Sequence, residues 1–338
     1  MALKRIVFTS PQIAELLDYE IAEPRADEIQ VALAVSTISS GTERANIMGS
    51  TTVAWNRPEA PAPIFPRCGG YSSAGTVVKV GAEVTKFAVG DRVALSWSTH
   101  SQVQNISAKN AHKLGSDLSF SDGALAHIAT FPLAAIRKCR LELGESAIVM
   151  GMGVLGMMAL QLLRIAGAAP IIAVDPDRAK REKALTLGAD FALDPYDPDF
   201  AQTVKELTGG GANVGIEVTG IGAGLDGILD CMARFGRVAL LGCTRNSDFT
   251  IDYYRKVHGP GITLIGAHTM ARPSRDSSGG WWSERDDFEA ILKLTRLGRL
   301  KLSSLVEETH SPQEAPQVYE RLCTEKTFPL VQFDWSEL

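Results

Sequence analysis

One stretch of the sequence, residues 146–175, constrains the fold more than any other. It begins with a short apolar run that is typical of a buried strand, and Gly151, Gly153 and Gly156 follow in G-x-G-x-x-G spacing. An apolar segment that indicates a buried helix comes next, and a second apolar run ends at Asp175. A strand, a glycine turn, a helix and a second strand with an acidic end form the unit that binds a dinucleotide.

Each glycine of this turn has a physical role. Gly151 makes the tight turn, and Gly153 lets the backbone approach the pyrophosphate. Gly156 allows the helix to pack closely against the strand. The free N–H groups and the positive dipole end of the helix, at about Val154, then face the phosphates. We predict that these four residues bind the cofactor.

Asp175 favours NAD over NADP, because a carboxylate accepts hydrogen bonds from both ribose hydroxyls and repels a 2′-phosphate. Arg178 and Lys180 follow closely. They are typical of a solvated first helical turn, but either would weaken that preference, so Arg178 is kept as a candidate cofactor contact. Thr219 and Gly242 follow later strands, at the sheet edge where cofactors bind, and are also candidates.

The pattern of strands and helices divides the chain into two predicted domains of the α/β class. After the glycine turn, buried strands alternate with helices, which is typical of a Rossmann domain with a doubly wound parallel sheet. Short strands separated by Gly and Pro come before it and predict a small β barrel or sandwich. We assign residues 127–270 to the Rossmann domain, and residues 1–126 and 271–338 to the β-rich domain. The expected helices are 121–140, 157–165, 177–188, 200–208 and 281–297, and the expected strands include 28–35, 74–80, 92–96, 190–193, 214–219, 238–241 and 262–265.

The composition is that of an ordinary globular protein and excludes several classes. The 338 residues are 45% hydrophobic and 22% charged, which suffices for a substantial core in two domains. A net charge of −5 argues against nucleic acid or an anionic membrane as the main partner. No apolar run suits a membrane helix or a signal peptide. The five cysteines are scattered without a C-x-x-C pair, so we expect reduced thiols in a soluble cytoplasmic protein.

The order of these parts resembles the zinc-type medium-chain dehydrogenase/reductase family over essentially the whole chain. The G-D-R-V segment at 90–93 and the glycine turn, in this order and separation, are together specific to that family. The S-G-T-E-R segment at 40–44 is similar to that of the threonine-dehydrogenase-like branch, which includes bacteriochlorophyllide dehydrogenases. The resemblance implies a GroES-like catalytic domain, a Rossmann domain, and hydride transfer between nicotinamide and an alcohol or ketone. Further supporting segments are 70–75, 123–125 and 297–300.

Most alcohol-oxidising members of this family hold a catalytic zinc, and this chain departs from their ligands. Ser40 stands at the position of a cysteine ligand and Ala45 at that of a histidine, while Tyr71 and Ser72 replace a His-Glu pair. Serine and tyrosine are poor zinc ligands. The third ligand position falls near His127, and one histidine cannot hold a zinc ion alone.

We therefore predict an enzyme that works without zinc, and we assign no metal ligand. The four closely spaced cysteines of the family's structural zinc are also missing, because no cysteine lies between Cys68 and Cys139. An unusual metal site formed by Cys68, His100 and His127 remains an alternative.

Four residues at or near the former metal position are candidates for catalysis. Without a metal, hydrogen-bond donors and a general acid/base must polarise the reacting oxygen and exchange its proton. We predict that Tyr71 or His127 is the acid/base, and that Thr42 and Ser40 hydrogen-bond the reacting oxygen. Thr42 matches the family's proton-relay hydroxyl. The alternatives are that Tyr71 only fills the vacated metal cavity and that His127 is a core histidine.

The resemblance implies further contacts. Thr130 matches a threonine that contacts the nicotinamide amide. Residues 262–267 resemble the strand by which relatives pair their sheets across a two-fold axis, so we expect a homodimer or homotetramer. Three roles are open for Glu43 and Arg44. They form an ion pair that orients the site residues, they contact the cofactor pyrophosphate, or they form an ion pair at the surface.

Three residues are candidates for contact with a small-molecule substrate. His100 lies in the loop S-T-H-S-Q, where relatives place substrate-facing residues, although a solvated histidine fits equally well. Trp281 and Trp282 follow a Ser/Gly loop. They would stack on a sugar ring or a flat ring system, anchor a dimer contact, or fill the core.

The leading functional hypothesis is an NAD(H)-dependent alcohol dehydrogenase or ketone reductase that acts on a polyol, sugar or related secondary alcohol without zinc. A zinc-free enone or quinone reductase is the second hypothesis, and Asp175 argues against it because such enzymes usually favour NADPH. A non-catalytic NAD(P)H-binding protein is the third. This third hypothesis would explain the loss of the zinc ligands, but it would not explain why Tyr71, Thr42 and His127 occur together.

Overall fold

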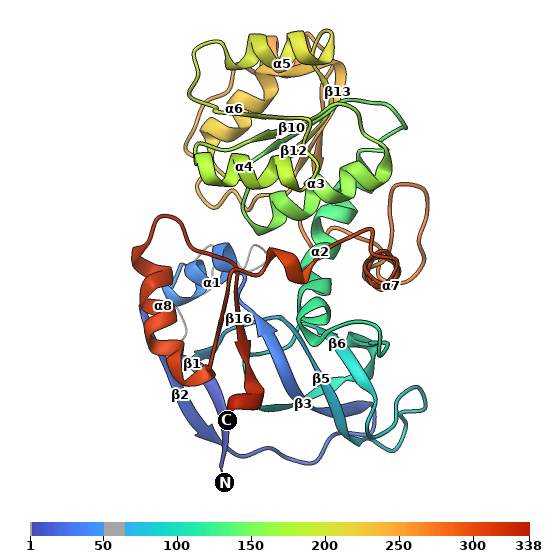
Figure 1. Ribbon diagram of the computed structural model, residues 1–338, viewed down its shortest axis with the longest axis vertical. Helices are drawn as coiled ribbons and strands as arrows, with labels where there is room; N and C mark the ends of the chain where they lie inside the picture. Colours follow the sequence, from blue (N-terminus) through green and yellow to red (C-terminus); the bar gives the residue numbers. More distant parts are fainter. Residues whose placement is uncertain (1, 51–64) are drawn as a thin grey trace. The chain divides into compact units, whose positions relative to one another are not determined.

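The computed structural model describes residues 2–50 and 65–338, and the chain divides into two compact units. Unit 1 comprises residues 1–128 and 292–338, and unit 2 comprises residues 129–291. Helices α2 (Phe120–Lys138) and α7 (Glu284–Arg296) each cross a boundary between the units. Both chain termini belong to unit 1 (Figure 1).

Unit 2 is built on a six-stranded parallel sheet with helices on both faces. The strand order is β11-β10-β9-β12-β13-β14, so the order reverses beside β9, the first strand of the sheet along the chain. Helices α3 and α4 cover one face, and α5 and α6 cover the other (Figure 1). This topology confirms the predicted Rossmann domain. The strands are β9 (Ala147–Met150), β10 (Ile171–Val174), β11 (Phe191–Leu193), β12 (Ala212–Glu217), β13 (Met232–Leu240) and β14 (Thr263–Gly266), and the helices are α3 (Val154–Ala166), α4 (Arg178–Thr186), α5 (Phe200–Thr208) and α6 (Gly222–Asp230).

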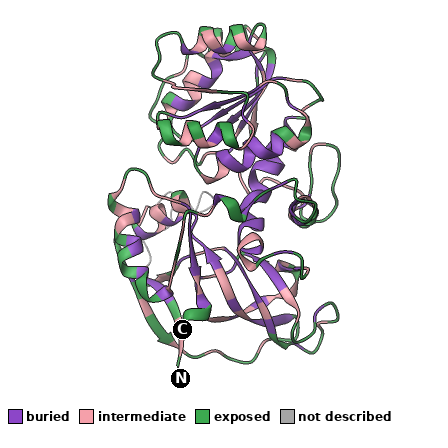
Figure 2. Ribbon diagram, viewed as in Figure 1, coloured by how far each residue is buried: buried purple, intermediate pink, exposed green. Residues whose placement is uncertain are grey.

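The helix that follows the glycine turn, α3, is apolar on nearly every side. Its residues from Gly156 to Leu163 are all buried, and Figure 2 shows the same burial in the strands of this sheet. The helix begins at Val154, earlier than the predicted residue 157, because Gly153 serves as its N-cap. It is closed by Gly167, whose φ of 90° is the left-handed conformation that glycine adopts easily at a helix end.

Unit 1 contains a seven-stranded sheet and a three-stranded sheet, which confirms the predicted β-rich domain. The larger sheet has the order β15-β16-β3-β5-β6-β8, and β7 also pairs with β3. All of its pairs are antiparallel except β15 with β16. The smaller sheet has the order β2-β1-β4. The strands are β1 (Leu3–Ser10), β2 (Ile13–Tyr19), β3 (Glu28–Thr37), β4 (Arg67–Cys68), β5 (Ser72–Val80), β6 (Arg92–Ser96), β7 (Val103–Ser107), β8 (Ala111–Lys113), β15 (Glu308–His310) and β16 (Val331–Asp334), and the remaining α-helices are α1 (Ser40–Ile47) and α8 (Ala315–Thr324).

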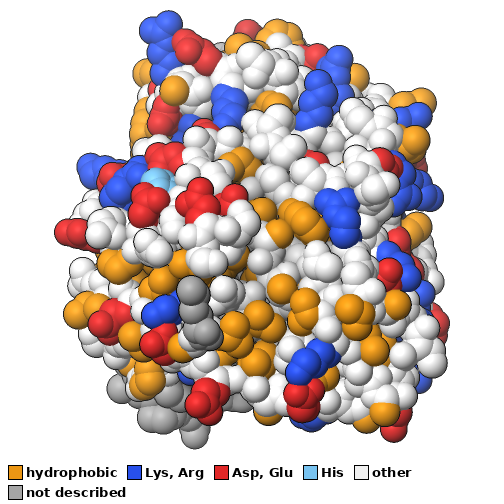
Figure 3. All heavy atoms as spheres, turned by 60° about the horizontal axis from the view of Figure 1, so that its bottom comes forward, with side chains coloured by type: hydrophobic (Ala, Val, Ile, Leu, Met, Phe, Trp, Pro, Cys, Tyr) orange, Lys and Arg blue, Asp and Glu red, His pale blue; other side chains and the backbone are white. Residues whose placement is uncertain are grey.

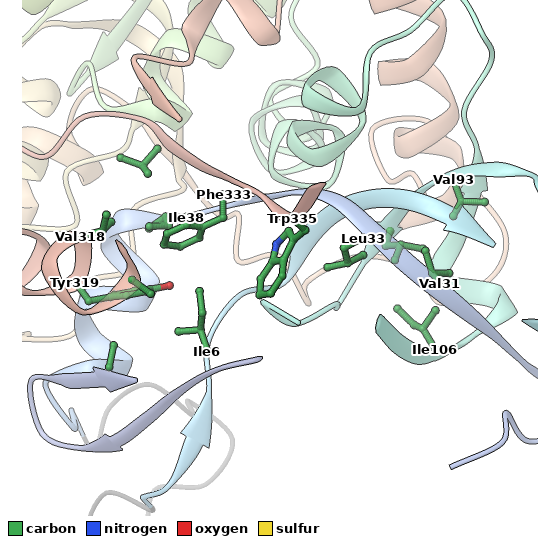
Figure 4. Close-up of a cluster of buried hydrophobic side chains, with 14 of the residues drawn as sticks. Ile6, Val31, Leu33, Ile38, Val93, Ile106, Val318, Tyr319, Phe333 and Trp335 are labelled. Atoms are coloured by element: carbon green, nitrogen blue, oxygen red, sulfur yellow. The ribbon is translucent and has the colours of Figure 1, made fainter. Parts of the chain in front are cut away.

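One hydrophobic cluster joins the two ends of the chain within unit 1. Tyr319 of α8, Phe333 of β16 and Trp335 share this cluster with Ile6 and Ile38 from the N-terminal segment (Figure 4). All five side chains are almost fully buried. Because burial of apolar surface is the main stabilising term in folding, the C-terminal segment is an integral part of the β-rich domain.

Two features differ from the sequence-based expectation. Residues 271–291, which we assigned to the β-rich domain, group with unit 2. One interaction that joins this segment to the rest of unit 2 is an ion pair, in which Arg137 near the end of α2 donates a hydrogen bond to the buried carboxylate of Asp287 in α7. In addition, the S-G-T-E-R motif lies in the helix α1, and we expected neither this helix nor α6.

The surface carries charges of both signs. On the face in Figure 3, Lys and Arg side chains are interspersed with Asp and Glu side chains. Within residues 2–50 and 65–338, no helix has both the length and the apolar character needed to cross a membrane.

Candidate active site

The glycine turn of unit 2 has the backbone geometry that a pyrophosphate needs. Gly151 adopts a φ of 103°, which side-chain-bearing residues rarely adopt. A Cβ atom on Gly156 would lie 1.9 Å from the carbonyl oxygen of Gly151, so only glycine fits there. A Cβ atom on Gly153 would meet no protein atom within 4 Å. The turn thus leaves open space at Gly153, and α3 begins at Val154 with its N–H groups available to an anion.

Asp175 lies at the end of β10 and is tied to the glycine turn. One carboxylate oxygen accepts a hydrogen bond of 2.8 Å from the N–H of Met152, and the other accepts one of 2.9 Å from the N–H of Asp177. The residue is 7% exposed. Each carboxylate oxygen keeps a second lone pair, so Asp175 can still accept hydrogen bonds from ribose hydroxyls. The residues of this turn therefore fit a dinucleotide.

Arg178 lies at the surface, near the start of α4. Its Nε atom donates a hydrogen bond of 2.8 Å to Glu182, and its side chain is 84% exposed. The cap of α4 is Asp177, which accepts hydrogen bonds from the N–H groups of Ala179 and Lys180. A contact of Arg178 with the cofactor stays a prediction.

The predicted contacts Thr219 and Gly242 lie together after β12 and β13. A Cβ atom on Gly242 would be 2.4 Å from the nitrogen of Gly220, the residue after Thr219. Glu217, which the sequence analysis missed, organises this turn by accepting hydrogen bonds from the N–H and hydroxyl of Thr219. Burial raises the pKa of Glu217, although these hydrogen bonds oppose it. An acidic residue ending an apolar strand was the signal that could have identified it.

Thr130 is buried in the part of α2 that belongs to unit 2. Its hydroxyl accepts a hydrogen bond of 3.4 Å from Nη1 of Arg272, a second residue that the sequence analysis missed. Arg272 lies in a polar loop without regular structure, where the sequence gives no signal of burial. The role of Thr130 toward nicotinamide stays a prediction.

In unit 1, Tyr71 and His127, the two alternative candidates for the acid/base, lie side by side, and the catalytic role of either stays a prediction. Their rings meet edge to face, with centroids 5.7 Å apart. Trp97 completes the cluster, with its ring centroid 4.9 Å from that of His127. Trp97 was missed in the sequence, and it adopts a φ of 59°, which is unusual for a bulky residue and is found more often at functional sites. The hydroxyl of Tyr71 donates a hydrogen bond to Ser39, the residue that precedes α1.

Ser40 and Thr42 occupy the first turn of α1 and are half-buried. The carbonyl oxygen of Thr42 accepts a hydrogen bond of 2.8 Å from the side chain of Asn46, one helical turn later. Their hydrogen bonds to a reacting oxygen stay predictions.

His100, the predicted substrate contact, is buried in unit 1 and is not a solvated histidine, and its contact with a substrate stays a prediction. It is 1% exposed, and both ring nitrogens are engaged: Nδ1 lies 2.7 Å from the hydroxyl of Ser36, and Nε2 lies 3.0 Å from Glu43. Tyr319 donates a further hydrogen bond to the same oxygen of Glu43. Burial and the charge of Glu43 raise the pKa of Tyr319 well above its ordinary value. The burial of His100 has a physical reason, because a buried carboxylate requires such donors.

Glu43 and Arg44 do not form a pair with each other. Glu43 points into unit 1 toward His100, whereas the guanidinium of Arg44 donates hydrogen bonds to the carbonyl oxygens of Leu322 and Glu325. Positive charge is favourable at these carbonyls because they end helix α8. Arg44 thus links α1 to the end of α8 by hydrogen bonds within unit 1.

The residues present do not fit a catalytic zinc. Among the residues that the structure describes, no three His, Cys, Asp or Glu side chains form a group that could hold a metal ion. The alternative site of Cys68, His100 and His127 is not assembled either, because both nitrogens of His100 are already engaged.

Trp281 and Trp282 pack against cations at the end of α2. The ring of Trp282 lies 3.6 Å from the guanidinium carbon of Arg137, and the ring of Trp281 lies 5.0 Å from Nζ of Lys138. Both tryptophans remain more than a third exposed, so neither is a core residue. Their contact with a ligand stays a prediction.

The chain matches two families of protein domains, one in each half. Residues 28–140 match the alcohol dehydrogenase GroES-like domain, and residues 154–294 match the zinc-binding dehydrogenase family. A D-guloside 3-dehydrogenase of Shigella flexneri is 27% identical over 338 residues, covering 94% of this chain and 95% of that protein. An (R,R)-butanediol dehydrogenase of Bacillus subtilis is 27% identical over 263 residues, covering 70% of this chain and 71% of that protein.

A solved structure, the benzyl alcohol dehydrogenase of Acinetobacter calcoaceticus, shares the fold. It superimposes with a TM-score of 0.84 over 99% of both chains, at 20% identity. The family matches, the relatives and the topology of both units agree with one another. The chain belongs to the zinc-type medium-chain dehydrogenase/reductase superfamily.

Proposed function

We propose that the protein is an NAD(H)-dependent dehydrogenase of polyols, sugars or related secondary alcohols that works without a catalytic zinc. Its superfamily makes it an oxidoreductase of the alcohol dehydrogenase type, which transfers a hydride between an alcohol or ketone and a nicotinamide cofactor. The observation that carries the proposal is the cluster of Tyr71, His127 and Trp97, in which a phenol and an imidazole lie together, while the described part of the chain forms no group of side chains that could hold a metal ion.

The protein's own task in this chemistry is to move a proton at the substrate oxygen. When bound, the nicotinamide accepts or supplies the hydride. During alcohol oxidation Tyr71 as the phenolate takes the proton of the substrate hydroxyl, and during ketone reduction Tyr71 as the phenol returns that proton to the carbonyl oxygen. The hydrogen bond to Ser39 positions the phenolic oxygen. His127 lies against the Tyr71 ring and is the second candidate for the acid/base. General acid/base catalysis of this kind contributes about 10²- to 10⁴-fold to the rate.

NAD is preferred over NADP in this proposal because of Asp175. Its buried carboxylate is fixed by two backbone N–H groups and would repel a 2′-phosphate. The nearest arginine in sequence, Arg178, is engaged with Glu182 at the surface. Arg178 therefore does not supply a positive charge that would neutralise a 2′-phosphate.

Three further observations support the proposed substrate class, compartment and assembly. The names of the two relatives, which act on a guloside and a butanediol, favour a substrate with several hydroxyl groups. All five cysteines are free thiols, which favours a reducing compartment such as the cytoplasm. Strand β14 is the last in its sheet, which favours a homodimer through that edge.

The test is NADH formation from NAD with a panel of polyols, sugars, sugar acids and simple secondary alcohols, repeated with NADP. The proposal expects turnover of at least one polyol, sugar or sugar acid and a preference for NAD. Reduction of quinones or enones by NADPH without alcohol oxidation would instead support a reductase. Tight NADH binding without any turnover would support a binding protein, and either result would overturn the proposal.

A further inference from the structure

Arg272 is a buried arginine with two unused donors. It lies in the loop after β14, and its side chain is 6% exposed. Its Nε and Nη2 atoms have no hydrogen-bond partner among the described residues. A buried charged group that lacks hydrogen bonds is costly, so these two N–H groups call for an acceptor.

The other side of the guanidinium is held by protein groups. Nη1 donates a hydrogen bond of 3.4 Å to Thr130 and lies 3.6 Å from the carboxylate of Asp287. The guanidinium carbon lies 6.0 Å from the ring centre of Phe131. Because Nη1 is fixed in this way, Nε and Nη2 remain as one edge with two roughly parallel N–H bonds. That edge matches the two oxygens of a carboxylate or a phosphate.

The surroundings of Arg272 carry charges of both signs. The carboxylates that act on it are Asp287 and Glu284. Asp287, however, already accepts a hydrogen bond from Arg137, so its charge is shared between two arginines. Lys138 adds a further buried cation, whose Nζ donates to the carbonyl oxygen of Gly266.

A nearby histidine, His268, is surrounded by the same cations. Burial lowers the pKa of His268, and three cations lower it further: Arg245, Lys138 and Arg272. Its Nδ1 accepts a hydrogen bond from the N–H of Met270, so in the neutral ring the proton is on Nε2. A neutral histidine with an Nε2–H donor is compatible with an anionic ligand.

We propose that the Nε–Nη2 edge of Arg272, with Lys138 in support, is a subsite for an anionic group of the substrate. The group is a carboxylate or a phosphate, and the substrate class is accordingly a sugar acid or a sugar phosphate rather than a neutral polyol. The assignment of the anion to the substrate depends on the proposed dehydrogenase function. The anion site itself depends only on unit 2.

The experiment is calorimetric titration of the full-length protein, saturated with NADH, with three probes at low ionic strength. The probes are gluconate, inorganic phosphate and the neutral polyol sorbitol. The variants are R272Q, R272K and the matched control R275Q, since Arg275 is an exposed arginine in the same loop. NADH binding, followed by its fluorescence, and the melting temperature establish that each variant is folded.

The site predicts that the wild type and R275Q bind gluconate or phosphate equally and more tightly than sorbitol. R272Q should weaken anion binding about tenfold or more, and R272K less, because lysine keeps the charge but loses the paired N–H bonds. Preference for gluconate over phosphate, or the reverse, identifies the anion. Equal binding of gluconate and sorbitol by the wild type would overturn the proposal without the use of any variant, and equal anion binding by R272Q and R275Q would overturn it too.

The outcomes separate this site from the proposed function. If no alcohol is oxidised but anion binding still depends on Arg272, the dehydrogenase proposal fails and the anion site stands. If polyols are oxidised and no anion binds, the anion site fails and the dehydrogenase proposal stands.

Discussion

The carboxylate of Glu43 lies 3.0 Å from Nε2 of His100, and both side chains are at most 2% exposed. The other carboxylate oxygen of Glu43 accepts a hydrogen bond of 2.9 Å from the N–H of Ser39. The hydroxyl of the same Ser39 accepts a hydrogen bond from Tyr71. This buried polar network therefore holds Ser39 in place, and Ser39 in turn orients Tyr71, the candidate acid/base.

Replacement of Glu43 by glutamine tests this network while keeping the size of the side chain. The amide cannot accept from Ser39, His100 and Tyr319 with the strength of a carboxylate, so we expect a loss of about 1–3 kcal/mol in the free energy of unfolding. Urea denaturation measures this loss. Glu15→Gln, at an exposed position of β2, is the control and should change stability little. Equal stability of both variants would mean that the network contributes nothing.

Replacement of Tyr71 by phenylalanine removes the candidate proton donor and leaves the ring. We expect kcat to fall by about 10²-fold or more, because a positioned acid/base contributes that much. NADH binding, measured by fluorescence, should remain unchanged. Tyr254→Phe, at a residue that is 73% exposed, serves as the control. A Tyr71→Phe enzyme with normal turnover would exclude this tyrosine and shift the role to His127.

Two glycines of the same turn should respond differently to alanine. In Gly153→Ala the new Cβ meets no protein atom within 4 Å, so folding should be unaffected while NADH binding weakens, since the methyl group occupies the space of the pyrophosphate. In Gly156→Ala the Cβ would collide with the carbonyl oxygen of Gly151, and we expect destabilisation by about 1–3 kcal/mol. Melting curves and NADH titrations of both variants separate the two effects. Normal NADH affinity in Gly153→Ala would contradict the assigned position of the cofactor.

His310 should make the stability of unit 1 depend on pH. Burial favours the neutral ring, but hydrogen bonds to Glu308 and Glu314 outweigh it and raise the pKa of His310. A group with a raised pKa stabilises the fold below its unfolded value of about 6.5, and this contribution is lost as pH rises through the folded pKa.

The measurement compares the melting temperature of the wild type with that of His310→Gln. We expect the wild type to be more stable by a few tenths of a kcal/mol, up to about 1, at about pH 6, since the pairs are partly exposed. The difference should shrink at about pH 9. A stability difference between the two proteins that grows with pH would contradict the raised pKa of His310.

The Rossmann unit could be predicted because its signals are local. Strands β9 and β10 are continuous apolar runs, and α3 and α5 end at glycines in the left-handed conformation. Helix α1 could not be predicted in the same way, because the polar sequence S-G-T-E-R-A-N-I has no apolar face. Its position depends on Glu43 and Arg44, whose partners His100, Tyr319 and Leu322 are far away in the sequence.

The candidate site was predicted only in part for a related reason. Tyr71 and His127 could be paired because each falls at a former metal-ligand position of the family. The burial of His100 could not be foreseen, because the loop S-T-H-S-Q is polar and its burial depends on Ser36 and Glu43. Arg272 was missed likewise, since its partners Thr130 and Asp287 lie on two helices, α2 and α7.

Turnover by the metal-stripped protein tests zinc independence most directly. The protein is treated with a strong chelator, its metal content is checked by elemental analysis, and NADH formation is followed with the polyol, sugar and sugar-acid panel. Catalysis by Tyr71 and His127 predicts that the stripped and untreated proteins oxidise the same substrate at the same rate. Loss of turnover on stripping, with recovery on addition of zinc, would contradict it.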